Sequence, residues 1–194
     1  MANGRIQRPD DTDYYVAPWS SNVMQGDFFD EVPLGFPVPP DAVFVAEGER
    51  HFLTGPFDAA LAMLITPSCA MAAQGAGAGP DVYAHPARTL VPMRPVQDLL
   101  NSGAVRAANL GNLRSDRLVN YMYLPERDGG WPESAALLYL PITMHHDVID
   151  QNRVAQLTGT AFWHLRSKLM AFAGGFAIQP SEFGEPPEPQ SRQS

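Results

Sequence analysis

Ser68 and Cys69 are the residues whose position along the chain best suits a nucleophile. They follow the apolar run 59–65 and a Thr-Pro turn, and active-site side chains are often found where a buried strand ends. A hydroxyl or thiol needs a neighbouring base before it attacks a substrate. The candidate bases are His51, His85, His145 and His146. No G-x-S-x-G elbow is present, so the competing interpretation is a buried structural cysteine.

A cluster of arginines forms a second candidate site. Arg106, Arg114 and Arg117 lie close together in the sequence, with Asn109 between them. Arginine and asparagine are residues that contact phosphate and sugar groups, so this stretch is the part of the chain best suited to binding phosphate or RNA. The alternative interpretation is a surface loop. The Gly-rich segment 74–80 lacks the lysine and the following helix of a phosphate-binding loop.

The segment His145-His146-Asp147 contains side chains that can bind metal ions. Asp147 can orient a histidine. However, adjacent histidines point to opposite faces of a strand, so both bind one ion only where they lie in a turn. No H-x-x-x-H or H-E-x-x-H spacing is present. We therefore expect a solvated connection or a pH-sensitive contact here, and we predict no metal site and no cofactor.

Composition limits the classes of protein to which the chain can belong. Its 21 acidic and 13 basic residues give a formal net charge of -8, which disfavours a non-specific nucleic-acid binder. The single cysteine excludes an intrachain disulfide and fits a reducing compartment. The N-terminus has no apolar signal region, and the longest apolar stretch is too short to cross a bilayer. We therefore expect a cytoplasmic protein without membrane contact.

The candidate residues must be positioned by short elements, because 19 prolines and 16 glycines interrupt the chain. Alternating or continuous apolar runs predict a mainly β fold. A short helix is expected over 96–102. The strands are expected over 25–33, 42–46, 59–65, 81–93, 118–124 and 135–140.

The clearest helix is predicted over about 160–174. Apolar residues at helical spacing mark its core face, and Gly174-Gly175 supplies its C-terminal stop. Arg166 and Lys168 lie toward the C-terminal end, where positive charge favours the helix dipole. The residues expected on the core face are Phe162, Leu165, Leu169 and Phe172.

The chain is expected to hold one domain with two flexible ends. Residues 1–23 are polar and acidic and predict a flexible N-terminal arm, although its tyrosines can dock on a surface. Residues 24–178 form the predicted β-barrel domain with its closing helix. Residues 179–194 are rich in Pro, Glu, Ser and Gln and predict a disordered tail.

The order of these segments resembles the PemK/MazF-like family of bacterial toxin–antitoxin systems. Gln25–Pro33 (QGDFFDEVP) resembles the entry strand of that family, and 150–158 with the following helix resembles its closing segment. The resemblance implies a small SH3-like β-barrel with insertions, usually a homodimer, that cuts single-stranded RNA without a metal. The family's "RPVLII" strand resembles 60–65 here, so the arginine at the start of that strand corresponds to a position near Ala60. Arg50 or Arg88 would have to replace it.

The chain also resembles uncharacterised bacterial proteins with QGDIF, S-x-D-C-D-I and LPES motifs. It keeps QGDFF at 25–29, the Ser68-Cys69 pair, and PES at 132–134. Ser68 and Ala70 stand beside the cysteine, where those proteins have aspartates.

From these observations we expect a non-catalytic protein-binding or assembly module on a MazF-like barrel. Its partner would be a second copy, another protein, or both, while its acidity disfavours RNA. The alternative is a divergent, metal-independent endoribonuclease acting on single-stranded RNA, and whether the chain is an enzyme stays open. A third possibility is a hydrolytic or metal site that uses Cys69 with His85 or His145. The candidate catalytic residues are Ser68, Cys69, Arg88 and Arg114, and the candidate binding residues are Arg106, Asn109, Arg117, His85 and His145.

Overall fold

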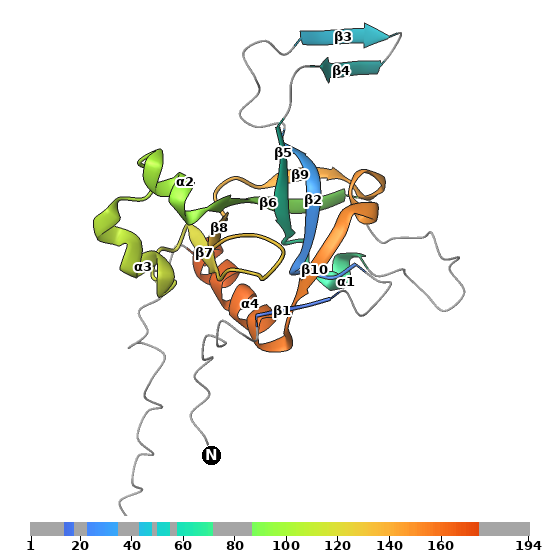
Figure 1. Ribbon diagram of the computed structural model, residues 1–194. Helices are drawn as coiled ribbons and strands as arrows, with labels where there is room; N and C mark the ends of the chain where they lie inside the picture. Colours follow the sequence, from blue (N-terminus) through green and yellow to red (C-terminus); the bar gives the residue numbers. More distant parts are fainter. Residues whose placement is uncertain are drawn as a thin grey trace, which may run out of the picture.

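The computed structural model describes residues 14–17, 23–34, 43–47, 50–54, 58–71 and 87–174 (Figure 1). The strands are β1 Tyr15–Val16, β2 Asp27–Leu34, β3 Val43–Glu47, β4 Arg50–Thr54, β5 Asp58–Leu64, β6 Ala87–Pro95, β7 Tyr121–Leu124, β8 Ser134–Leu137, β9 Ile142–His145 and β10 Arg153–Leu157. The helices are α1 Ser68–Met71, α2 Val96–Asn101, α3 Leu110–Arg114 and α4 Gly159–Gly174. Short 3-10 turns are η2 Ala107–Asn109, η3 His146–Val148 and η4 Asp150–Asn152.

Eight of the strands form one antiparallel sheet, so the prediction of a mainly β fold with a C-terminal helix is confirmed. Its order is β1-β10-β2-β5-β6-β8-β7, with β9 paired to β6, and β3 and β4 form a separate hairpin. Among the described strands, no backbone ladder joins β1 to β7. Instead, Tyr14 Oη donates to the Tyr123 carbonyl at 3.3 Å and Tyr15 Oη donates to the Pro125 carbonyl at 2.8 Å. The sheet is therefore curled but open, and tyrosine hydroxyls bridge its two edges.

The main core lies inside this curl and under α4. Tyr15 packs edge-on against Phe28 and Trp131, with ring centroids 5.5 and 5.0 Å away. Tyr14 is completely buried. Tyr14 to Ala17, which belong to the predicted N-terminal arm, therefore contribute to the folded body, while most of 1–22 and all of the predicted tail lie outside the described residues.

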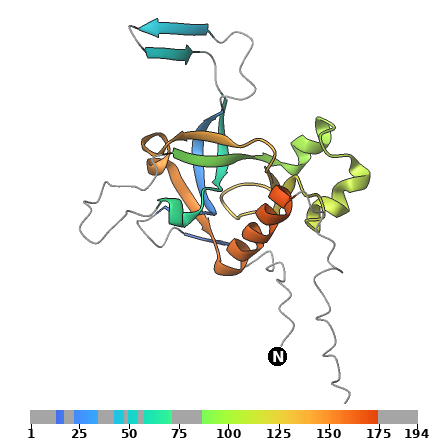
Figure 2. The same cartoon turned by 180° about the vertical axis from the view of Figure 1, so that it is seen from behind.

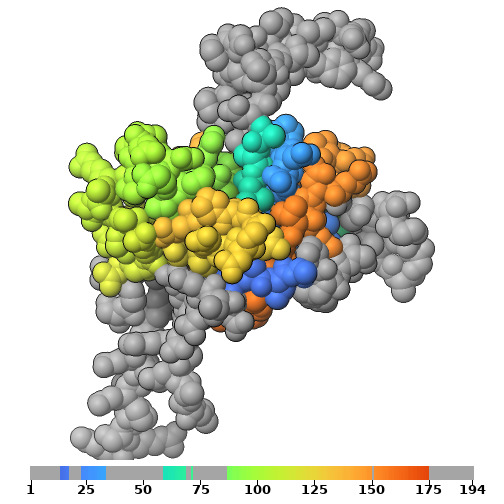
Figure 3. Space-filling model, viewed as in Figure 1, coloured from blue at the N-terminus to red at the C-terminus, as the bar shows by residue number. Residues whose placement is uncertain are grey.

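The helix α4 occupies the stretch where the sequence predicts one, and it closes the open side of the sheet (Figure 2). Ala161 and Leu165 are fully buried in the same cluster as Met122 and Leu124. The helices α2 and α3 instead form an excursion at one end of the molecule (Figure 3). No described helix is both long and apolar enough to cross a membrane.

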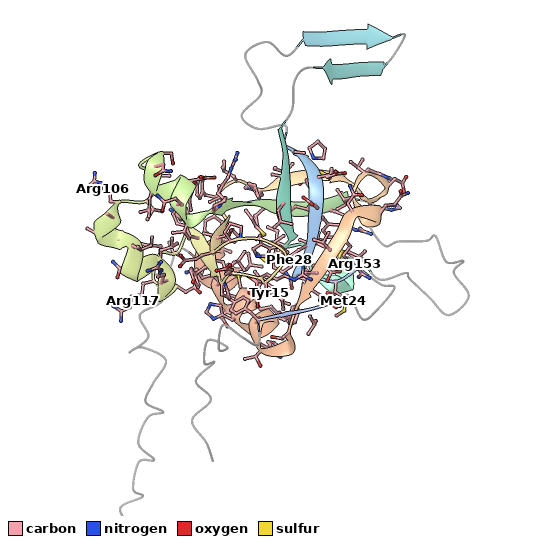
Figure 4. The ribbon with its side chains drawn as sticks, in the orientation of Figure 1. Tyr15, Met24, Phe28, Arg106, Arg117 and Arg153 are labelled. Atoms are coloured by element: carbon pink, nitrogen blue, oxygen red, sulfur yellow. The ribbon has the colours of Figure 1, made fainter. Side chains whose placement is uncertain are left out.

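The sequence QGD joins three strands at the start of β2. Gln25 Nε2 donates to the Ile65 carbonyl at 2.7 Å. Gly26 has a φ of +90°, and a Cβ there would lie 3.0 Å from Leu157 Cδ1, so both its conformation and the approach of β10 require glycine. Asp27 is fully buried, and its Oδ2 lies 3.0 Å from Arg153 Nη1 on β10. Figure 4 shows Arg153 beside the segment that precedes β2.

Replacing Arg153 with methionine tests the buried ion pair between Asp27 of β2 and Arg153 of β10, which we call the QGD latch. The Arg153→Met variant keeps most of the side-chain volume but leaves the Asp27 carboxylate buried without its cation. We expect a loss of about 3 kcal/mol in the free energy of unfolding, because removing one partner of a buried ion pair is strongly destabilising. Urea unfolding measures the change. Arg94→Met, at an exposed position on β6, is the matched control, and equal stability of both variants would contradict the assignment.

Candidate functional site

The predicted arginine cluster lies on the α2–α3 excursion. Arg106, Asn109 and Arg117 are exposed there, and Figure 4 shows Arg106 and Arg117 pointing away from the body. Arg114 forms a two-pronged ion pair with Glu133, with Nε–Oε1 at 2.6 Å and Nη2–Oε2 at 2.8 Å. The hydrogen bonds and negative charge of Glu133 raise the pKa of Arg114. Arg114 thus holds the excursion against the segment before β8.

The predicted nucleophile region lies at the other end of the sheet. Ser68 begins α1, and its hydroxyl accepts the Gln25 backbone N–H at 3.1 Å, which ties α1 to the start of β2. The side chain of Cys69 and the whole of His85 lie outside the described residues. His145 is exposed at the end of β9. The third possibility, a site joining Cys69 to His85 or His145, therefore stays a prediction.

Arg88 is fully buried on β6. Its side chain lies on the same face of β6 as that of Leu90, two residues later. Arg88 pairs in register with Met144 of β9. Leu90 and Met144 belong to a second apolar cluster with Phe29 and Ile149. A guanidinium at this depth is out of reach of a macromolecular substrate, so Arg88 has a structural position.

The predicted catalytic residues therefore do not gather at one place. Arg114 is on the α2–α3 excursion, whereas Ser68 is on α1, and Figures 1 and 2 both show these elements at opposite ends of the sheet. All three arginines of the excursion are exposed, and Arg114 is ion-paired with Glu133.

A buried polar network beneath α4 was not anticipated from the sequence. Asp116 follows α3 with a φ of +54°, a left-handed conformation that aspartate tolerates better than most residues. Its Oδ1 accepts the Tyr123 backbone N–H at 2.7 Å, and its Oδ2 lies 2.9 Å from His164 Nε2. Lys168 Nζ lies 3.6 Å from Oδ1 and also donates to the Asp116 carbonyl. This network joins α4, α3 and β7.

Lys168 is only 1% exposed, and the last turn of α4 contains no basic residue, so Arg166 and Lys168 lie farther from the helix end than the dipole expectation needs. Burial lowers the pKa of Lys168, while the nearby Asp116 carboxylate opposes that shift. The lysine faces inward because Asp116 supplies both a carboxylate and a carbonyl. The fully enclosed residues of α4 are Ala161, Leu165, Lys168 and Ala171, while the predicted Phe162, Leu169 and Phe172 are partly buried and also pack against the core.

Apolar side chains also lie on the side of α4 that faces away from Lys168. Trp163 is 55% exposed and Met170 is 75% exposed. Arg166 lies between them and stacks over the Trp163 ring, with 5.0 Å from Cζ to the ring centroid. Phe162 and Leu169 flank them, partly buried against the core. We call these five residues the α4 outer face.

One signal in the sequence pointed to this arrangement. Lys168 is the only lysine in the chain, and it directly precedes Leu169 at the border of the predicted apolar stripe. A lysine in that place indicates either an interrupted core face or a buried partner. The partner, Asp116, is 52 residues earlier, and no local pattern reveals it.

The single lysine makes the burial of Lys168 directly measurable. In the folded chain the pKa of Lys168 lies below the ordinary value of 10.5. The folded chain therefore releases the Lys168 proton at a lower pH than the unfolded chain does. The Lys168 contribution to the free energy of unfolding therefore rises as the pH increases toward 10.5 and levels off above it. In NMR of lysine-labelled protein, we expect one side-chain signal that titrates below 10.5. Urea unfolding of Lys168→Met should lack this rise with pH, and a titration at or above 10.5 would contradict the burial.

Comparison with known proteins adds no family assignment. No protein-family model matches the chain, and no curated protein matches it. The resemblance to PemK/MazF-like proteins therefore depends on the quoted motifs alone, and the function must be argued from the positions of the side chains.

Proposed function

We propose that this chain is a non-catalytic protein-binding module and that the α4 outer face is its binding surface. The observation that carries the proposal is the exposure of Trp163 and Met170 on α4, on the side away from the buried Lys168. Exposed aromatic, methionine and arginine side chains are the residues enriched at protein interfaces, and Trp and Arg are frequent binding hot spots.

The charge of this surface indicates the chemistry of the partner. The helix α4 contains no aspartate or glutamate, although the whole chain carries a net charge of -8. Arg166 is held on the Trp163 ring, so its guanidinium is already positioned for a carboxylate, which it can bind with two parallel hydrogen bonds. The partner is a protein segment that presents apolar side chains and at least one carboxylate.

A second copy of the chain fits the same surface less well. A two-fold axis places the same patch on both partners, and Arg166 lies midway between Trp163 and Met170. Two helices packed face to face at this patch would bring the two Arg166 side chains together, which costs binding energy. A homodimer through α4 is therefore an outcome to be tested against the heterologous partner.

The finer fold assignment is also part of the proposal. The QGDFF strand, the late strands and the closing helix follow the order of a MazF-like barrel, and this supports a divergent relative of that fold. The tyrosine bridges from Tyr14 and Tyr15 would take the place of a closing backbone ladder. The buried position of Arg88 and the ion pair of Arg114 support a module that has no cleavage chemistry of its own.

Site-specific photocross-linking tests the proposed surface. A benzoylphenylalanine at position 170 should form a cross-link in the source cells to a segment with apolar residues and a carboxylate. The identified segment, synthesised as a peptide, should bind the purified chain, and Trp163→Ala should weaken binding by about 2 kcal/mol or about 30-fold. Fluorescence polarisation measures the dissociation constant.

Two controls make the result specific. Tyr139→Ala removes another exposed aromatic residue, 40% exposed at the β8 end, and should leave peptide binding unchanged. A cross-linker at the exposed Asn101 should not capture the same segment. Cross-linking only to a second copy, absence of any specific product at position 170, or a peptide whose binding survives Trp163→Ala would each contradict the proposal.

The exposure of Arg106 and Arg117 favours a second candidate function, cleavage of single-stranded RNA. Both guanidinium groups extend from the excursion into solvent, where phosphate can reach them. If this alternative holds, the purified chain cuts single-stranded RNA without a metal, and the Arg106→Ala/Arg117→Ala variant loses this activity. Arg94→Ala is the matched surface control. Intact RNA after incubation with the unmodified chain would exclude the alternative.

A further inference from the structure

The side chains of His145, His146 and Asp147 converge at the junction between β9 and η3. His145 Nδ1 lies 3.2 Å from Asp147 Oδ2, and His146 Nδ1 lies 3.1 Å from Asp147 Oδ1. The two imidazole rings are stacked, with centroids 4.5 Å apart and 29° between their planes. One nitrogen from each histidine and one carboxylate oxygen all lie within 4.8 Å of one another.

The local backbone explains why neighbouring histidines face the same side. β9 ends at His145 with extended angles (φ -70°, ψ 144°), and the 3-10 turn η3 begins at His146. The change from strand to turn cancels the alternation that would otherwise separate the two rings. The sequence analysis predicted no metal site, but it noted that adjacent histidines can bind one ion where they lie in a turn.

We propose that His145, His146 and Asp147 bind a divalent transition-metal ion such as Zn²⁺. In a tetrahedral zinc site with arms of about 2.0–2.1 Å, two ligand atoms are about 3.3 Å apart. Each histidine nitrogen lies at about this spacing from a different oxygen of Asp147, His145 from Oδ2 at 3.2 Å and His146 from Oδ1 at 3.1 Å. Binding would require the side chains to turn so that one carboxylate oxygen and both nitrogens face the ion, and His145 and Asp147 are exposed.

The surroundings favour a cation at this position. His145 stands in register with Ala87 on β6, and a methyl group there leaves the ring accessible. Arg88, the next residue, lies on the buried face of the strand with Leu90, so its charge does not point at the ligands. The Asp147 backbone N–H is 3.4 Å from His145 Nδ1, a weak contact that a metal bond replaces.

The ligand set determines which ions bind. Imidazole nitrogen suits zinc, cobalt, nickel and copper, whereas magnesium and calcium require oxygen ligands. Three protein ligands leave at least one coordination position open for water or for a group from a partner. The site therefore resembles an open, accessible zinc site more than a closed structural one.

Calorimetric titration with Zn²⁺ and visible absorption with Co²⁺ test the site, on full-length protein purified without a histidine tag. We expect one ion per chain at this site and no binding of Mg²⁺. Removing a ligand with His145→Gln or Asp147→Asn should weaken Zn²⁺ binding at least about tenfold, the range found even for residues that only orient ligands. The matched control Asp128→Asn removes the same charge at an exposed turn and should change nothing.

A His145→Ala/His146→Ala double variant supplies the baseline for any binding by other histidines. Affinity of the unmodified chain equal to this baseline would overturn the proposal, as would unchanged affinity in Asp147→Asn. Binding of one ion per two chains, with dimer formation on sizing, would also overturn it, because the three ligands of one chain would then not form the site. The α4 outer face is remote in sequence from these ligands, and the Trp163→Ala variant should bind Zn²⁺ normally.

Discussion

The contact between Lys168 and Asp116 determines how α4 sits on the sheet. A lysine ammonium is costly to bury without a partner, and Asp116 offers it a carboxylate and a carbonyl. Because one residue of α4 is fixed inward, the rotation of the whole helix is fixed. Trp163 and Met170 then have no core to enter. The buried contact and the exposed apolar side chains thus lie on opposite sides of the same helix.

The same interaction depends on the open sheet. Asp116 is held in its left-handed conformation by the Tyr123 backbone N–H, and the Tyr123 carbonyl accepts the Tyr14 hydroxyl from the opposite edge of the sheet. The hydroxyls of Tyr14 and Tyr15 bridge the two edges of the sheet where no backbone ladder joins them. The helix α4 packs across this open side. The QGD latch holds the other half of this arrangement, since Asp27 and Arg153 fix β10, the strand that leads directly into α4.

The sequence predicted the elements whose signals are local. The apolar run 59–65 corresponds to β5, and the helix signals over 160–174 correspond to α4. The strand β10 was missed because the polar segment before it resembles a connection, and its stability comes from pairing with β2 more than a hundred residues away. The burial of Lys168 was not predicted for the same reason, since its carboxylate partner, Asp116, is distant in the sequence.

The candidate site shows a similar division. Residue types identified Arg106, Arg117 and His145 as exposed polar groups. They could not show that Arg114 forms an ion pair with Glu133. The structure also distinguishes two exposed arginines of this acidic chain, Arg106 and Arg166, by their surroundings. Arg106 is a solvated charge, and binding must order it. Arg166 is already stacked on Trp163 beside apolar side chains, so little freedom is lost when it meets a carboxylate. That difference is the physical reason why the proposed binding surface is α4 and not the excursion.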